Sequence, residues 1–279
     1  MDAVTKKQLE IIATKIRMAV IEGTYNAKCG HPGGSLSIAD DLAVLYFSEM
    51  NVDPANPDWA DRDRLVLSKG HCAPALYGAL ALRGYFPEEW IPTLRKTDSP
   101  LQGHPDMKGT PGVDMSTGSL GQGVSTAVGM ALAGKLDNKD YRVYAILGDG
   151  EIGEGQVWEA AMFASAKGLN NLTVIVDNNN LQIDGTVEEV NSSYPIPEKF
   201  AAFGFNVIEI DGNDVEQIEA AVRQSKTADK PTAIVQKTVK GKGVSFMENQ
   251  CNWHGAAPNK EQYDVAMAEL TARLAELEG

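Results

Sequence analysis

A glycine-flanked aspartate, Asp149, most constrains what this chain can fold into, because it directly follows a short apolar run at residues 143–147. A second apolar run, residues 172–176, precedes three consecutive asparagines. The segment between them, residues 155–167, has the helical pattern that a crossover between two parallel strands requires. The order strand, helix, strand therefore predicts two parallel neighbours whose carboxyl ends meet at one edge of a sheet.

That edge carries oxygen ligands that suit a divalent metal. The carboxylate of Asp149 and a carboxamide from residues 178–180 are hard donors, which Mg²⁺ and Ca²⁺ accept while they keep other positions for phosphate oxygens and water. The neighbouring glycines, Gly148 and Gly150, let the backbone come close to phosphate groups. The pattern therefore predicts a metal ion that anchors phosphate. The alternative interpretation is an ordinary turn in which Asp149 caps a helix.

Composition limits the partners that such a site can have. The chain has 279 residues, 43% of them hydrophobic, which is enough for a substantial core, and its lack of repeats or linkers favours a single domain over residues 1–279. The 38 acidic and 25 basic residues give a net charge of −13, which argues against nucleic acid or an anionic membrane as a partner. No signal-like leader and no long apolar stretch are present, so we expect a cytoplasmic protein with no membrane partner. The three cysteines have no metal-ligand spacing, which fits a reducing compartment.

Strand and helix patterns alternate along most of the chain. This alternation predicts an α/β fold in which a parallel sheet is flanked by helices on both faces. The expected strands lie at residues 65–67, 143–147, 172–176, 207–210 and 232–236. The expected helices lie at residues 5–26, 35–50 with Ser35 as its cap, 73–82, 119–136 with Ser119 as a possible cap, 155–167, 215–224 and 261–277.

Several short motifs give the chain a family resemblance. They are GHPGG (30–34), LSKGH (67–71), GHP (103–105), TGSLGQG (117–123), LGDGEIGEG (147–155), DNNNLQIDG (177–185) and HG (254–255). In this order they resemble transketolases, and they extend over nearly the whole chain. The resemblance is to the N-terminal, diphosphate-binding portion of such enzymes only, so the chain resembles the N-terminal subunit of a split transketolase.

This resemblance implies the cofactor and the partner. The cofactor would be thiamine diphosphate with Mg²⁺ or Ca²⁺, held between two domains. The second domain, which binds the pyrimidine and supplies an activating glutamate, would come from a C-terminal transketolase subunit. The substrates would be sugar phosphates of the kind that the pentose phosphate pathway uses. The assembly would most simply contain two copies of each subunit, a heterotetramer.

The resemblance also assigns residues to the cofactor. Asp149, Asn179 and the carbonyl of Leu181 would bind the metal. The remaining cofactor-binding residues would surround the diphosphate or lie along the rings, and they are Gly148, Gly150, Glu151, Gly118, Ser119, Leu120, His71 and His254.

All four histidines, His31, His71, His104 and His254, stand beside glycine or proline, which predicts one clustered site. Imidazoles with near-neutral pKa values suit the proton movements of ketol transfer, so all four are candidate catalytic residues. By resemblance, His31 and His104 would contact the hydroxyls and carbonyl oxygen of the ketose. His71 and His254 would lie nearer the diphosphate. A purely hydrogen-bonding role for one or two of them stays open.

Two further features have both a functional and an ordinary interpretation. Glu154 and Glu159 stand where the family places glutamates at its dimer interface, although exposed helical glutamates are usually only solvated. The segment 237–243 resembles a flexible loop that closes over the cofactor, although its lysines, Lys240 and Lys242, are equally compatible with surface charges.

Three other functions are compatible with parts of the sequence. The chain could be the α subunit of a 2-oxo acid dehydrogenase, a part of a deoxyxylulose-phosphate-synthase-like enzyme, or a non-catalytic binding subunit. The GHPGG motif and the four histidines disfavour the first two, because those reactions do not need this set of contacts to donor hydroxyls. The intact ligands and histidines also disfavour a binding role without chemistry.

Overall fold

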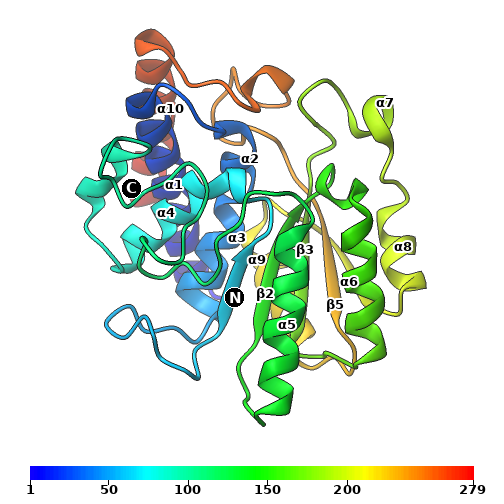
Figure 1. The fold of residues 1–279 in the computed structure, drawn as a ribbon. Helices are drawn as coiled ribbons and strands as arrows, with labels where there is room; N and C mark the ends of the chain where they lie inside the picture. The colour runs from blue at the N-terminus through cyan, green and yellow to red at the C-terminus, as the bar shows by residue number, and fades with distance from the viewer.

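Five parallel strands form the centre of the molecule, which a computed structural model describes over residues 1–279 (Figure 1). Their order across the sheet is β1-β2-β3-β5-β4, and every neighbouring pair is parallel, as the sequence predicts. The strands are β1 (Arg64–Leu67), β2 (Val143–Gly148), β3 (Leu172–Asn178), β4 (Asn206–Asp211) and β5 (Thr232–Lys237).

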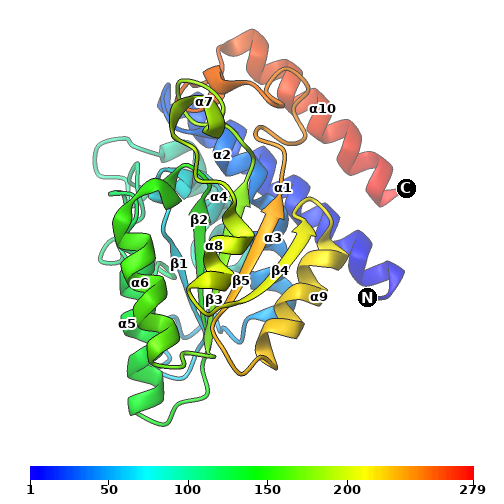
Figure 2. The same cartoon turned by 90° about the vertical axis from the view of Figure 1, so that its right-hand side faces the viewer.

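Helices cover both faces of this sheet (Figures 1 and 2). One face is covered by α5 (Gln122–Leu136), α6 (Gly155–Ala166) and α8 (Ile196–Ala202). The other is covered by α1 (Ala3–Ala27), α2 (Pro32–Ser37), α3 (Ala39–Val44), η1 (Leu45–Glu49), α4 (Ala73–Arg83), α9 (Val215–Lys226) and α10 (Lys260–Glu278). Shorter helical segments are η2 (Gly70–Cys72), η3 (Glu88–Thr93), η4 (Glu151–Gly153), α7 (Val187–Asn191) and η5 (Cys251–Trp253). None of the helices combines the length and hydropathy that a membrane-spanning helix needs.

The apolar runs of the strands supply both layers of core. In β2, Tyr144 and Ile146 belong to the core under α1 and α4, whereas Ala145 and Leu147 belong to the core under α5 and α6. Successive strand residues point to opposite faces, so a strand that is covered on both sides must be apolar throughout. This is why residues 143–147 and 172–176 lack the polar alternation of a half-exposed strand.

The helix expected at residues 35–50 is wrong in its start and its continuity. Ser35 is not its cap: α2 begins at Pro32 with His31 at the cap position, and the Ser35 hydroxyl donates back to the His31 carbonyl at 2.7 Å. Proline is favoured in the first helical turn because its missing N–H would have no partner there. The helix is then interrupted at Ile38, between α2 and α3. Its last segment is the wider π-helical turn η1.

The helix expected at residues 119–136 begins later than predicted. Its cap position is Gly121, whose φ of 79° lies in the left-handed region, and Ser119 precedes the helix as part of a turn. The prediction missed α7 and α8 as well. The signal for α7 was present, because Thr186 and Glu189 form a reciprocal capping box, but the helix has only 5 residues.

Candidate functional site

A cavity of about 460 Å³ opens at the carboxyl ends of β2 and β3. It gathers most of the predicted site residues, namely His31, His71, Gly118, Leu120, Gly148, Asp149, Gly150, Glu151, Glu154, Asn179, Leu181 and His254. His104, Ser119 and Glu159 do not line it. A second cavity, of about 520 Å³, is also lined by residues 178–180, but none of the histidines lines it. The chemistry-bearing residues therefore favour the first cavity as the functional site.

The predicted metal ligands occupy two turns that meet at this edge. Asp149 follows β2, and its carboxylate accepts hydrogen bonds from the backbone N–H groups of Gly150, at 2.8 Å, and of Asn180. The side-chain oxygen of Asn179 accepts from the N–H of Leu181 at 3.1 Å. The bond from Asn180 to Asp149 joins the two turns, which brings a carboxylate, a carboxamide and a main-chain carbonyl to the same edge. All three donors are hard oxygens, and they fit a magnesium or calcium ion.

The backbone around Asp149 is close enough to its neighbours to serve as a phosphate cradle. A Cβ atom on Gly150 would lie 2.9 Å from the side chain of Gln182, so a larger residue there would have to displace that side chain. Burial raises the pKa of Asp149 to about 7, and the nearby charge of Asp177 adds to the effect. A bound cation would favour the ionised carboxylate, and this again fits a metal ligand.

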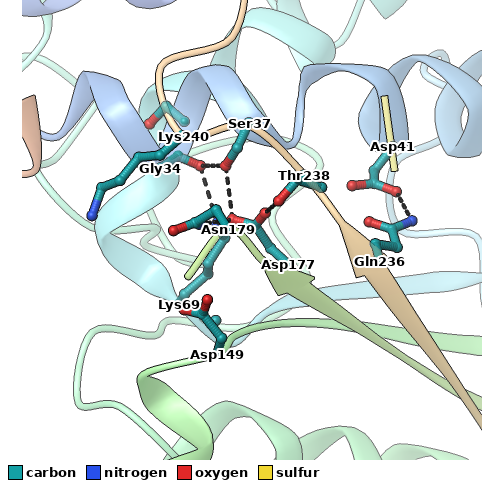
Figure 3. A network of polar contacts seen from close by, with 12 residues as sticks. Gly34, Ser37, Asp41, Lys69, Asp149, Asp177, Asn179, Gln236, Thr238 and Lys240 are labelled. Atoms are coloured by element: carbon teal, nitrogen blue, oxygen red, sulfur yellow. Dashed lines mark hydrogen bonds and ion pairs between the residues drawn. The ribbon is translucent and has the colours of Figure 1, made fainter. Parts of the chain in front are cut away.

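Asp177, the last buried residue of β3, fixes the orientation of Asn179 (Figure 3). Its carboxylate accepts from the Asn179 amide nitrogen at 2.8 Å, from the Ser37 hydroxyl at 2.7 Å, and from Thr238. Because the amide nitrogen of Asn179 is used by Asp177, its oxygen faces the other way, where it accepts from the Leu181 N–H and keeps a second lone pair that suits a metal ion. In the sequence, Asp177 stands within the asparagine motif, but no role was predicted for it.

A fully buried ion pair joins this network to α2. Lys69 contacts the Asp177 carboxylate and donates to the carbonyl of Gly34 at 3.0 Å. Burial alone would lower the pKa of Lys69, but the charge of Asp177 outweighs it and raises that pKa above its ordinary value. Lys69 and Asp177 are therefore both charged, and they form a rigid base under the cavity.

The four histidines form one cluster, as predicted, and three of them, His31, His71 and His254, line the cavity while His104 lies beside His31. The ring centroid of His31 lies 5.2 Å from that of His71, 5.6 Å from that of His254 and 6.3 Å from that of His104. His71 and His254 are stacked at 5.1 Å. Four loops far apart in the sequence therefore place imidazole groups around one point.

The near-neutral pKa values expected for these imidazoles are not found. Burial lowers the pKa of His31 to about 4 and that of His254 to about 3. Burial also lowers the pKa of His71 and, with the charge of Arg95, that of His104. All four rings are therefore neutral at pH 7, so each can donate one hydrogen bond and accept another.

Glu151 lines the cavity, but its carboxylate is engaged with the protein. It accepts from the Ser68 hydroxyl at 2.5 Å and from the N–H groups of Gly121 and Gly148 at 2.9 and 3.0 Å. This buried side chain ties the Gly148 turn to the start of α5. It therefore supports the shape of the site.

Lys240 belongs to the site, a question that its sequence context leaves open. Its side chain is only 1% exposed, and its ammonium donates to the carbonyl of Leu181 at 2.9 Å and contacts His254 Nδ1 at 2.9 Å. Burial lowers the pKa of Lys240. Lys242, by contrast, lies partly exposed on the same loop. For Lys69, Asp177 and Lys240, the sequence signal was a charged residue at or just beyond the end of a buried strand.

Of the two predicted interface glutamates, Glu159 lies in a stripe with two exposed apolar side chains, whereas Glu154 lines the cavity. Glu154 and Glu159 are both exposed. Glu159 shares one face of α6 with Met162 and Phe163, which are 59% and 43% exposed. Met162 and Phe163 thus form a small exposed apolar patch next to Glu159.

Comparisons with known proteins identify the family of the chain. Residues 8–272 match the family described as transketolase, thiamine diphosphate binding domain. The chain is 50% identical to the 6-deoxy-6-sulfo-D-fructose transketolase subunit SqwG of Clostridium sp. (strain MSTE9), over 92% of this chain and 94% of the relative. It is 44% identical to one subunit of the apulose-4-phosphate transketolase of Phocaeicola vulgatus, over 97% of this chain and 96% of the relative.

Longer relatives match over less than half of their length. The transketolase of Homo sapiens is 40% identical over 95% of this chain but only 42% of its own. The crystal structure of transketolase from Campylobacter jejuni superimposes with a TM-score of 0.90 and 33% identity, over 99% of this chain and 46% of that chain. The fold described above is thus similar to one part of these enzymes.

Proposed function

The chain belongs to the transketolase family, and from this premise we propose that residues 1–279 form one domain, the cofactor-binding half of a two-chain transketolase. The complete enzyme transfers a two-carbon ketol unit from a ketose to an aldose. The observation that carries the proposal is the joint presence of the histidine cluster and the metal-ligand turns in one cavity. The near-complete match to two relatives named as subunits supports the division into two chains.

Thiamine diphosphate with Mg²⁺ or Ca²⁺ is the cofactor that fits the cavity. Asp149, Asn179 and the carbonyl of Leu181 would hold the metal, and the N–H of Gly150, which donates to the Asp149 carboxylate in this structure, would donate to a phosphate oxygen instead. Gly118, Leu120, Gly148 and Glu151 line the rest of the cavity, and Ser119 lies between Gly118 and Leu120 in the chain without lining it. When bound, thiamine diphosphate supplies the carbon nucleophile and the electron sink for breaking the bond between C2 and C3 of the ketose.

The histidines bind the substrate and move its protons. His31 and His104 hold the ketose hydroxyls and carbonyl oxygen, and His71 and His254 lie on the diphosphate side. Neutral imidazoles can orient these oxygens and accept a proton as a substrate O–H bond breaks. The low pKa values of the rings favour hydrogen bonding as their resting role.

The partner chain supplies the pyrimidine-binding domain and its glutamate, without which the cofactor is not activated. Two copies of each chain make the simplest closed assembly, in a cytoplasmic setting. The stripe of Glu159, Met162 and Phe163 supports pairing of this chain across a two-fold axis, with Glu154 close to it.

The sugar specificity is expected to depend on the partner as well as on this chain. The two relatives matched above over more than nine-tenths of their length are named for a sulfonated ketose and for apulose 4-phosphate, not for the common pentose phosphates. A donor panel should therefore contain 6-deoxy-6-sulfofructose and apulose 4-phosphate beside xylulose 5-phosphate and fructose 6-phosphate.

Reconstitution tests the proposal. The purified chain should show no ketol transfer at any cofactor concentration, and adding the partner should restore turnover with at least one donor of the panel. In the reconstituted enzyme, His104→Ala should lower kcat by about 100-fold or more, because a proton-transfer contact is lost. Its thiamine diphosphate affinity should remain unchanged, as calorimetry would measure.

Full ketol-transfer activity of this chain as a monomer would overturn the proposal that the active enzyme needs two chains. A loss in His104→Ala that is confined to cofactor affinity would instead place this histidine with the diphosphate.

A further inference from the structure

The ammonium group of Lys240 donates a hydrogen bond to the Leu181 carbonyl, one of the oxygens proposed as metal ligands. It lies 2.9 Å from this carbonyl and 3.4 Å from the carbonyl of Gln182. Its remaining close partner, His254 Nδ1 at 2.9 Å, belongs to an uncharged ring. Lys240 is only 1% exposed and makes no ion pair, so its direct contacts are all neutral acceptors, while the carboxylates of Asp149 and Asp177 attract it only from beyond contact distance.

The position of this ammonium group is fixed by the backbone that carries it. The carbonyl of Lys240 accepts from Asn249 at 2.9 Å, and the next N–H, of Gly241, donates to the carbonyl of Gly33 at 2.9 Å. A Cβ on Gly241 would lie 2.3 Å from the Met247 carbonyl oxygen, so the loop packs tightly on itself. The Lys240 head group can therefore leave Leu181 only by a change in its own side-chain rotamers.

A metal ion at Leu181 would compete directly with Lys240. Two cations cannot share one carbonyl without strong repulsion at this separation and burial. If the metal arrives alone, Lys240 must leave its acceptors without gaining an anion, and an unpaired buried charge is costly. If a diphosphate arrives with the metal, its anionic oxygens offer Lys240 a replacement partner.

We propose that Lys240 is an internal cation that competes with the metal for the carbonyl of Leu181 and so makes metal binding dependent on the diphosphate. The inference rests on the proposed cofactor site. The metal-free site is then held together by Lys240, and the metal without its diphosphate binds weakly. Binding of either component removes part of the cost of binding the other, which is positive coupling between the two.

The test measures Mn²⁺ binding to the full chain without any diphosphate, by the electron paramagnetic resonance signal of free Mn²⁺. Lys240→Met keeps the length of the side chain but removes its charge, so Mn²⁺ should bind about tenfold more tightly than to the wild type. Lys242→Met is the matched control, because it removes the same charge from an exposed position on the same loop. Its affinity should stay within about twofold of the wild type, since screening weakens exposed charges.

Lys240→Gln provides a second variant that can still donate a hydrogen bond to Leu181 without a charge. It should also bind Mn²⁺ more tightly than the wild type, by a smaller factor than Lys240→Met. Equal Mn²⁺ affinity of both Lys240 variants and Lys242→Met would overturn the competition but leave the metal site standing. Absence of Mn²⁺ binding in every form would overturn the metal site and this inference together, whereas the reconstitution assay tests ketol transfer separately.

Discussion

At the scale of single residues, the site depends on charged groups that the fold removes from water. Asp149 accepts two backbone hydrogen bonds, and Asp177 accepts bonds from the Asn179 amide and the Ser37 hydroxyl. The sequence predicted Asp149 because glycines flank it after an apolar run. It could not assign Asp177 or Lys69, because a charged residue acquires its role here only when folding brings residues distant in the sequence around it.

The raised pKa of Asp149 predicts a pH-dependent metal affinity. In the metal-free chain this pKa is about 7, so below pH 7 a proton competes with the metal for the carboxylate. The affinity should fall about tenfold for each pH unit below 7 and become constant above about pH 8. Titration calorimetry with Mg²⁺ or Mn²⁺ between about pH 5.5 and 8.5 would measure it. A carboxyl of ordinary pKa would give a flat profile over this range, and such a profile would contradict the prediction.

At the scale of elements, the strands and most of the longer helices were predictable, including the starts of α4, α6 and α9, whereas the starts of α2 and α5 were not. Apolar runs identify the strands because both sheet faces are covered, and five expected strands are present. The start of α5 depends on the contact of Gly121 with Glu154 and Glu151, which are distant in sequence. Local capping preference at Ser119 therefore gave way to tertiary packing.

Gly121→Ala should destabilise the chain. The φ of Gly121 is 79°, and an added Cβ would lie 2.7 Å from the Cβ of Glu154, so we expect a loss of about 1–3 kcal/mol in the free energy of unfolding. Gly129→Ala is the control in the same helix, because nothing lies within 4 Å of its added Cβ. That change should be neutral or stabilising by about 0.5–1 kcal/mol. Urea denaturation would compare them, and equal stabilities would refute the proposed helix start.

At the scale of the whole molecule, the two sides of the sheet differ in what they leave exposed. The face with α1, α4 and α10 has the larger core, of 41 buried residues against 23. The face with α5 and α6 is the thinner layer (Figure 2). Its Met162 and Phe163 are exposed. The sequence located this surface only through the resemblance that placed Glu154 and Glu159 there, since exposed apolar residues cannot be told from buried ones by type.

Phe163→Glu should weaken pairing of this chain in the reconstituted enzyme. A charge at the centre of an apolar contact loses buried area and adds a desolvation cost. Val265→Glu on α10 is the control, because Val265 is 44% exposed and Phe163 is 43% exposed. Light scattering should show about half the wild-type mass for Phe163→Glu and the full mass for Val265→Glu. Unchanged mass in both variants would exclude α6 from the contact.

The concentration of the site at the carboxyl ends of the strands leaves the opposite edge of the sheet available to the experimenter. The loop that leads into β1 lies at that edge, and its Asp58 is exposed (Figure 1). A cysteine introduced there would carry a fluorescent dye or a surface tether, once the partly exposed Cys29 and Cys251 have been replaced. Cys72 is fully buried and can stay. Single molecules could then be immobilised with the cofactor cavity facing the solution, and arrival of the metal and the partner chain could be timed separately.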